Sequence, residues 1–179
     1  MYLILSASPN IDGLTAACVD AALAGFADAG VAAKHYNLCT LSIARCRQCG
    51  NGWGQCLKEH TCVINDDLGL LQRDLAGALG LVIVTPVYYG EMAESAKCAF
   101  DRLRRCEATR GDAGALTGKP VLAVAAAGGS GGGVSSCLTS MERLSHHLRG
   151  QVADLIGITR RSRAYKLDTI RAAAIEMAK

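Results

Sequence analysis

Four cysteines lie within one short stretch of the chain, with the spacing Cys-x2-Cys-x6-Cys-x5-Cys: Cys46, Cys49, Cys56 and Cys62. Thiolates this close in sequence can ligate a tetrahedral zinc ion or an iron–sulfur cluster. The glycines between the second and third cysteines exclude a regular helix or strand there, so packing on a helix face does not explain the set. We predict that the four act as one metal-binding set. The alternative is that some are free thiols in a cysteine-rich chain.

The chain contains nine cysteines, an odd number that cannot all pair. In a reducing compartment such thiols stay free for metal or redox chemistry. His60 lies between the last two cysteines of the set and is an alternative ligand. The remaining cysteines fall on expected helices or strand ends, and we expect small buried side chains there: Cys18, Cys39, Cys98, Cys106 and Cys137.

A second group of polar residues follows the first apolar run, Met1–Ala7, and leads into an alanine-rich segment. Its members carry hydroxyl or amide groups: Ser6, Ser8, Asn10 and Thr15. Hydroxyls and free backbone N–H groups at a helix N-terminus form an anion site, and a phosphate monoester would fit it. The alternative is a helix start capped by Ser8 or Thr15.

Two further loops could complete a binding site. Pro86-Val87-Tyr88-Tyr89-Gly90 ends an apolar run, and its tyrosines could flank a planar ring; the alternative is a tyrosine packed on the sheet edge. The glycine-rich loop 128–133 follows a later apolar run and matches neither a dinucleotide fingerprint nor a P-loop. A flexible surface loop is its alternative interpretation.

The order of the elements decides whether these loops meet. We predict strands at 1–7, 31–38, 81–85, 120–127 and 152–158, and helices at 14–29, from Asp66–Asp67 to Leu79, and at 95–106, 134–149 and 166–178. This alternation predicts an α/β fold with a five-stranded parallel sheet and helices on both faces. The flavodoxin-like, doubly wound order 2-1-3-4-5 suits it, and places the three loops at the carboxyl ends of strands, in one crevice. We expect a single domain, 1–179, with a cysteine-rich loop at about 41–65.

Composition excludes several classes of protein. The 19 basic and 16 acidic residues give a net charge of only +3, without a basic block, which argues against nucleic-acid binding. The nearest cluster, Arg160, Arg161 and Arg163, is expected at a solvated strand exit. No apolar run approaches the ~20 residues of a membrane span. Met1–Ser8 is too short for a signal peptide, so we expect a cytoplasmic protein without membrane contacts.

The sequence resembles the NADPH-dependent FMN reductase superfamily. The similarity rests on these motifs: Ser8-Pro9 with Thr15, Thr85-Pro86-Val87-Tyr88-Tyr89, Lys97 with Phe100-Asp101-Arg102, and the glycine-rich run. Two segments are similar to its iron–sulfur flavoprotein branch: Cys62-Val63-Ile64-Asn65-Asp66-Asp67 and Tyr165-Lys166-Leu167.

The resemblance implies a flavodoxin-like subunit that binds FMN in dimers or tetramers. The phosphate would lie on the first loop, at Ser6, Ser8, Pro9, Asn10, Gly13, Leu14 and Thr15. The ribityl chain and ring would lie along Pro86, Val87, Tyr88, Tyr89, Gly90, Gly128, Gly129 and Gly131. In the cluster-bearing branch four compactly spaced cysteines hold a [4Fe–4S] centre near a neighbouring subunit's flavin.

The chain departs from the family pattern in two places. Asn10 stands where relatives commonly carry arginine, and Leu14 where they carry asparagine. Gly52 occupies the position of the usual third cysteine, so Cys56 would have to take its place from a longer loop.

We therefore expect an FMN-dependent oxidoreductase that takes electrons from NAD(P)H or a protein donor. No catalytic side chain is required, because N5 of the flavin accepts the hydride. A non-enzymatic electron carrier is one alternative, although such carriers tend to be strongly acidic. A zinc-stabilised flavodoxin-like module without flavin is the other.

Overall fold

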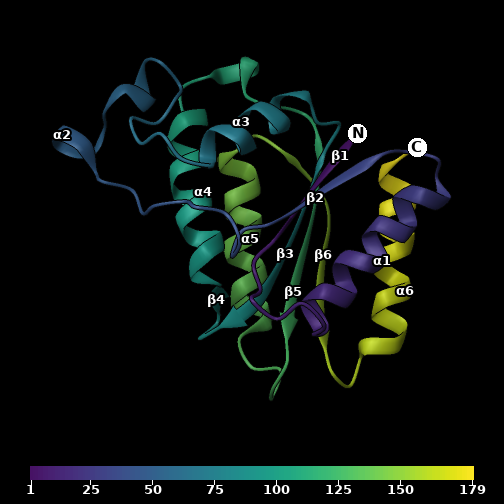
Figure 1. Ribbon diagram of the computed structural model, residues 1–179. Coiled ribbons are helices and arrows are strands. Elements are labelled where there is room, and N and C mark those ends of the chain that lie inside the picture. Colours follow the sequence, from purple (N-terminus) through teal and green to yellow (C-terminus); the bar gives the residue numbers. More distant parts are fainter.

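Five parallel strands form the sheet in the computed structural model, which describes residues 1–179 (Figure 1). They are β1 (Tyr2–Ser6), β2 (Ala33–Asn37), β3 (Leu81–Tyr88), β5 (Pro120–Ala127) and β6 (Gln151–Thr159). Their spatial order is β2-β1-β3-β5-β6. Counted along these five strands, it is the predicted order 2-1-3-4-5. The short strand β4 (Glu91–Met92) pairs antiparallel with the end of β3 and was not predicted.

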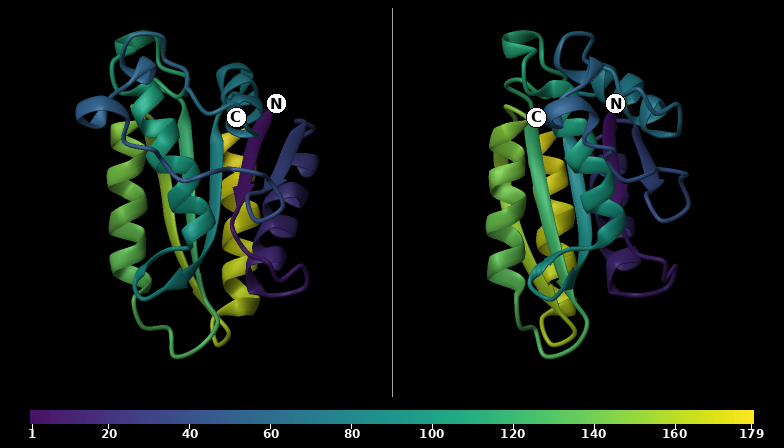
Figure 2. Two further views of the ribbon diagram at one scale, coloured as in Figure 1. Left: turned by 60° about the vertical axis from the view of Figure 1, so that its left-hand side comes forward. Right: turned by 90° about the vertical axis from the view of Figure 1, so that its left-hand side faces the viewer.

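Helices cover both faces of the sheet, as predicted (Figure 2). On one face lie α1 (Leu14–Asp28) and α6 (Arg163–Met177). On the other lie α3 (Leu68–Gly77), α4 (Glu94–Glu107) and α5 (Val134–His147). None of the helices combines the length and the apolar character that crossing a bilayer requires.

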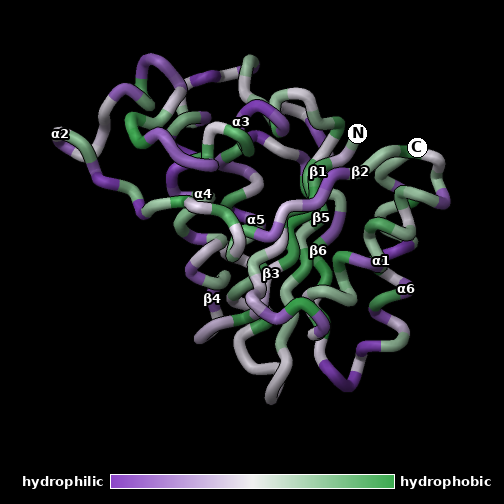
Figure 3. The backbone as a smooth tube through the Cα atoms, viewed as in Figure 1, coloured by the Kyte–Doolittle hydropathy of each residue, from purple (hydrophilic) through white to green (hydrophobic).

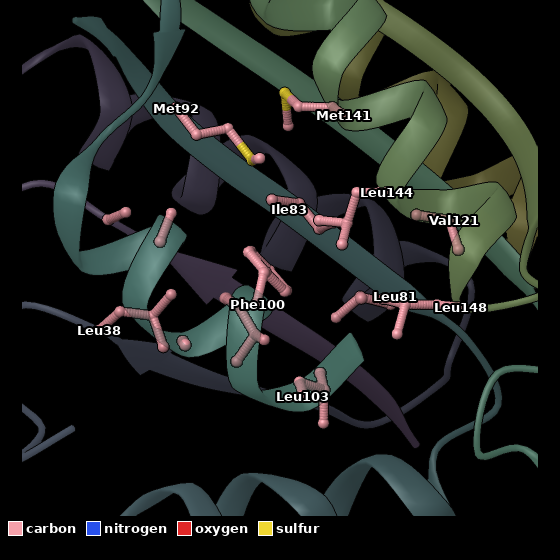
Figure 4. Close-up of a cluster of buried hydrophobic side chains, with 14 of the residues drawn as sticks. Leu38, Leu81, Ile83, Met92, Phe100, Leu103, Val121, Met141, Leu144 and Leu148 are labelled. Atoms are coloured by element: carbon pink, nitrogen blue, oxygen red, sulfur yellow. The ribbon is translucent and has the colours of Figure 1, made fainter. Parts of the chain in front are cut away.

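The core follows from strand alternation. In β1, Leu3 and Leu5 pack toward α3, α4 and α5, whereas Tyr2 and Ile4 pack toward α1 and α6. The central strands β3 and β5 are apolar on both sides, which is typical of parallel strands that carry helices on each face. Figure 3 shows this hydrophobic centre, and Figure 4 shows Ile83 of β3 among side chains of α4 and α5, including Phe100.

The cysteine-rich segment lies outside the sheet, beside α3 and α4 (Figures 1 and 2). It contains two short turns of helix, α2 (Cys49–Gly52) and the 3₁₀ turn η1 (Gln55–Leu57). Within α2, Gly50 and Asn51 depart from helical backbone angles, and Gly50 has a φ of 55°. The segment is therefore irregular, as its glycines indicated.

Candidate functional site

The loop after β1 is held by its own polar groups. Ser8 Oγ accepts a hydrogen bond from Asn10 N at 3.2 Å, and Asn10 Oδ1 accepts one from Asp12 N at 3.2 Å. Gly13 is the N-cap residue of α1, and no side chain caps the helix. The first backbone N–H groups of α1 therefore remain available to an anion.

A cavity of about 480 Å³ opens beside this helix start. Its lining comes from the ends of four strands: Ser8, Asn10, Gly13, Leu14 and Thr15 after β1, Pro86 in β3, Ala126 in β5 with Gly128 after it, and Arg160 and Arg163 after β6. The structure thus brings together seven of the residues expected at a flavin site: Ser8, Asn10, Gly13, Leu14, Thr15, Pro86 and Gly128. No Asp or Glu lines this cavity, which we call the strand-end cavity.

A tight hairpin, formed by β3 and β4, lies at the same edge of the sheet as the strand-end cavity. Tyr89 and Gly90 have φ values of 52° and 82°, as the two-residue turn between β3 and β4 requires. Ser136 of α5 donates a hydrogen bond to Gly90 O at 2.9 Å. A Cβ on Gly133 would lie 2.6 Å from Gly90 Cα, so glycine is needed where the two loops touch.

The other expected site residues lie around this cavity, outside its lining. Ser6 Oγ is 2.9 Å from His35 Nε2 and faces a neighbouring cavity of about 160 Å³. Val87 packs against the hydrophobic core. Tyr88 and Tyr89 are 47% and 107% exposed on the hairpin. Three more lie in the adjoining loops: Pro9, Gly129 and Gly131.

Sequence reasoning missed Arg160 and Arg163, which it assigned only to a solvated strand exit. Arg160 lies in the turn after β6 and Arg163 is the first residue of α6. Thr159 N donates to Ser162 Oγ at 2.9 Å and fixes the turn between them. Neither arginine forms an ion pair or an intramolecular side-chain hydrogen bond. The sequence could have indicated both arginines, because they follow the last predicted strand, and ligands bind at the carboxyl ends of the strands in this fold.

The four cysteines of the predicted set line one small cavity of about 20 Å³, together with Cys106 of α4. We call it the cysteine cavity. This volume is close to that of a single buried water. No group of three or more His, Cys, Asp or Glu side chains is arranged to hold a metal ion. The sulfurs therefore share a cavity without forming a closed ligand set.

Arginines surround this cavity. Arg102 is fully buried in α4 and forms a two-pronged ion pair with Asp66, with N–O distances of 2.6 and 3.0 Å. Its Nε is buried without a hydrogen-bond partner. Arg105 donates to Gly52 O and lies 5.0 Å from the centre of the Trp53 ring. The unpaired Nε–H of Arg102 can donate a hydrogen bond to an anionic sulfur, either a free thiolate or a metal-bound one.

Local contacts also act on the sulfurs. Cys46 Sγ accepts a hydrogen bond from Gln48 N at 3.4 Å. A Cβ on Gly54 would lie 2.9 Å from Cys49 Cβ, so the glycine lets the backbone fold over that side chain. Burial, with the neighbouring Cys62 and Cys56, raises the pKa of the Cys106 thiol to about 12. Cys106 is therefore protonated in the absence of a metal.

The five remaining cysteines only partly follow the expectation of burial. Cys18, Cys106 and Cys137 are buried, and burial raises the pKa of Cys18 to about 12 and that of Cys137 to about 11. Cys98 is half-buried. For Cys39 the expectation is wrong: it is exposed beside Ser95, 3.3 Å from that hydroxyl, because it follows β2 outside the sheet. His60 lies outside the cysteine cavity, with Nδ1 3.4 Å from Thr109 Oγ1.

The parallel sheet and its strand-end cavity define a protein with the flavodoxin-like architecture. Residues 2–156 match the NADPH-dependent FMN reductase family, and the chain belongs to this family.

Relatives with curated names are iron–sulfur flavoproteins. One from Archaeoglobus fulgidus is 34% identical over 104 residues, which cover 58% of this chain and 50% of that protein. One from Methanocaldococcus jannaschii is 28% identical over 138 residues, covering 76% of this chain and 66% of that protein. The matched part of the chain spans about half the length of the first of these relatives.

Solved structures share the fold at low identity. An NAD(P)H:quinone oxidoreductase from Methanothermobacter marburgensis superposes with a TM-score of 0.74 at 16% identity, over 98% of this chain and 94% of that one. RosB superposes with a TM-score of 0.79 at 14% identity, over 99% of this chain and 78% of that one. These likenesses confirm the flavodoxin-like fold.

Proposed function

We propose that the protein is an FMN-dependent oxidoreductase that takes two electrons from NAD(P)H or a reduced protein donor. The observation that carries the proposal is the strand-end cavity, where an uncapped helix N-terminus meets the loops after β3 and β5. Membership of the FMN reductase family supports the cofactor. Bound FMN would supply the hydride and electron chemistry, and the protein its orientation.

The residues of the cavity fit such a cofactor. Ser8, in the loop after β1, and Thr15, in the first turn of α1, are buried hydroxyls that line the cavity and would donate to a phosphate. A Cβ on Gly128 would meet nothing within 4 Å, so that loop leaves open space for a ligand. Tyr88 and Tyr89 stand exposed on the hairpin beside it, where they would border the ring.

A carrier without enzymatic activity remains the second candidate. Its partners would be redox proteins, and strongly acidic surfaces serve such docking. With 19 basic and 16 acidic residues, the chain does not have that charge balance. Turnover of NAD(P)H by the FMN-loaded protein would favour the oxidoreductase. Reduction of its flavin only by a protein donor would favour the carrier.

FMN titration tests the proposal. Flavin fluorescence should report saturable binding at micromolar protein. Replacing both hydroxyls, Ser8→Ala with Thr15→Ala, should weaken binding by about 3–6 kcal/mol, since each hydrogen bond to a charged phosphate contributes about 1.5–3 kcal/mol. Ser42→Ala, on the distant cysteine-rich segment, is the control and should bind normally. Absence of FMN binding at micromolar protein would refute the proposal, and a colourless, zinc-containing protein would favour the flavin-free module.

We also propose that Cys46, Cys49, Cys56 and Cys62 bind a metal centre, either a [4Fe–4S] cluster or zinc, in a reducing, cytoplasmic setting. Their shared cavity and the unpaired Nε of Arg102 support this. The small volume means that the segment would have to rearrange around a cluster. Cys106, on the same cavity wall, is a fifth thiol within reach of the set.

Metal analysis of anaerobically purified protein tests the centre. Iron with sulfide identifies a cluster, and zinc alone identifies the other candidate. Cys49→Ser and Cys56→Ser should each remove the metal, because a tetrahedral site needs all its thiolates. Cys18→Ser, on α1, should retain it. Only trace metal, with all four thiols open to alkylation in the folded protein, would exclude the site.

A further inference from the structure

The strand-end cavity contains more positive charge than the loop after β1 provides. That loop contributes only neutral groups to its lining, including Ser8, Asn10 and Thr15. A phosphate monoester carries a charge of about −1.5 to −2 at neutral pH. The cationic side chains of the lining come from the opposite wall, as Arg160 and Arg163.

Both arginines are free to bind a ligand. They are exposed, form no ion pair or side-chain hydrogen bond within the protein, and face a cavity without acidic side chains. Arg161, between them in sequence, is also exposed but does not line the cavity. The turn after β6 and the first residue of α6 therefore bring Arg160 and Arg163, but not Arg161, to the same cavity.

The wall that carries them is fixed against α1. Both α1 and α6 follow strands at the same edge and lie side by side on one face of the sheet (Figures 1 and 2). Residues at the start of each helix line the cavity. A Cβ on Gly25 would lie 2.4 Å from Arg171 O, which shows how closely the helices approach. Asp28 and Arg171 form an ion pair at 2.5 Å where α1 ends. The two helices are thus packed together along their length, and their starts, at Leu14 and Arg163, line the same cavity.

We propose that Arg160 and Arg163 bind the 5′-phosphate of FMN from the side opposite the loop after β1. This inference rests on the proposed function. Guanidinium groups suit the task because they donate several hydrogen bonds to phosphate oxygens in fixed geometry. The phosphate would lie between two arginines and the N-terminus of α1. Arg160 and Arg163 would then supply the charged contacts to the phosphate, because Asn10 and the rest of the loop after β1 are uncharged in the lining.

Binding of FMN and of riboflavin, which lacks the phosphate, tests the inference. The variants are Arg160→Gln, Arg163→Gln and the double substitution, with Arg161→Gln as the matched control. Each cavity-facing substitution should weaken FMN binding about 10-fold or more, as expected for a charged hydrogen bond. Riboflavin affinity should stay within about twofold, because riboflavin has no phosphate for these arginines to contact. FMN affinity of the wild type, but not of the double variant, should fall with added salt.

The outcomes distinguish failure of the proposed function from failure of the inference. If the wild type binds neither flavin, the proposed function fails and the inference fails with it. If the wild type binds FMN but the variants lose FMN and riboflavin equally, or Arg161→Gln loses as much, the inference alone is overturned. It is also overturned if the variants keep their FMN affinity but lose discrimination between NADPH and NADH, since the arginines would then bind the nicotinamide cofactor's 2′-phosphate.

Discussion

Asp66 joins three parts of the chain through one carboxylate. Its oxygens accept hydrogen bonds from Ala44 N at 2.9 Å and Leu68 N at 3.2 Å, and pair with Arg102. Burial raises the pKa of Asp66, but the hydrogen bonds from Arg102 and the two backbone groups outweigh it and hold the pKa below 3.8. The pair fastens both ends of the cysteine-rich segment to α4.

Asp66→Asn should destabilise the protein by about 3–5 kcal/mol, because it leaves Arg102 buried without a counter-charge. The pH dependence follows from the lowered pKa. The stabilisation from Asp66 is complete above pH 3.8 and is lost as the pH falls through the folded-state pKa. Urea unfolding at pH 7 and at acidic pH measures both effects, and the variant should show a weaker loss of stability on acidification.

A double substitution provides the control. Asp66→Leu with Arg102→Met removes both charges and should be less destabilising than Asp66→Asn alone. A single variant as stable as the wild type at pH 7 would show that the ion pair does not hold the segment.

Some of the candidate site residues could be predicted from the sequence, and others could not. Ser8, Asn10 and Thr15 were found because hydroxyls and amides at an expected helix start indicate an anion site. Arg163 was not found, because the rule for strand ends was not applied to the last strand, and a charged residue after a strand was assigned to solvent. Cys106 was missed for a similar reason: its place on α4 predicts a small buried side chain, and only the fold of a distant loop brings it to the other thiols.

At the scale of elements, most of the fold could be predicted from local signals. The strand at 120–127 and the helix start at Val134 were placed correctly, because Pro120 and the glycine-rich loop mark their limits. The sheet order followed from the strand–helix alternation. Apolar runs bounded by proline or glycine identify buried parallel strands well.

The misses at this scale involve weak local signals. The strand expected at 81–85 runs on to Tyr88, because β4 pairs with residues beyond Pro86. That pairing depends on a positive φ at Tyr89, which nothing in a tyrosine predicts. The helix expected at 166–178 begins already at Arg163, since the Thr159–Ser162 hydrogen bonds start it earlier.

At the scale of the whole molecule, four of the nine exposed large hydrophobic side chains lie where the strands end. Ile11, Tyr88, Tyr89 and Tyr165 are 85%, 47%, 107% and 61% exposed, on the loop after β1, the hairpin and the first turn of α6. Apolar groups around a cavity mouth mark a surface that another molecule covers. We propose that a second copy covers it, in a homodimer or homotetramer.

Light scattering coupled to gel filtration should therefore report a dimer or tetramer. Ile11→Asn with Tyr89→Gly should shift the protein toward monomer while preserving the fold, because glycine adopts the positive φ at position 89 without strain. Leu79→Asn is the matched control: Leu79 is 53% exposed just before β3, at the opposite edge of the sheet, and its loss should leave the assembly intact. A wild type that is monomeric at working concentration would contradict the proposal.

The strand-end cavity and the cysteine cavity lie at opposite ends of the molecule. Helix α4 begins beside the hairpin, where Ala93 N donates to Thr85 Oγ1, and carries Arg102 and Cys106 to the cysteine cavity at its far end. Figure 1 shows the cysteine-rich segment at one end of α4 and β4 at the other. A 14-residue helix is about 21 Å long.

The two cavities have no lining residue in common. The cysteine-rich segment can therefore accumulate substitutions, or lose its thiols one by one, without altering a single group around the strand-end cavity. In evolutionary terms the two sites are free to diverge at different rates. A descendant that had lost every cysteine of the segment would still inherit the complete lining of the other site.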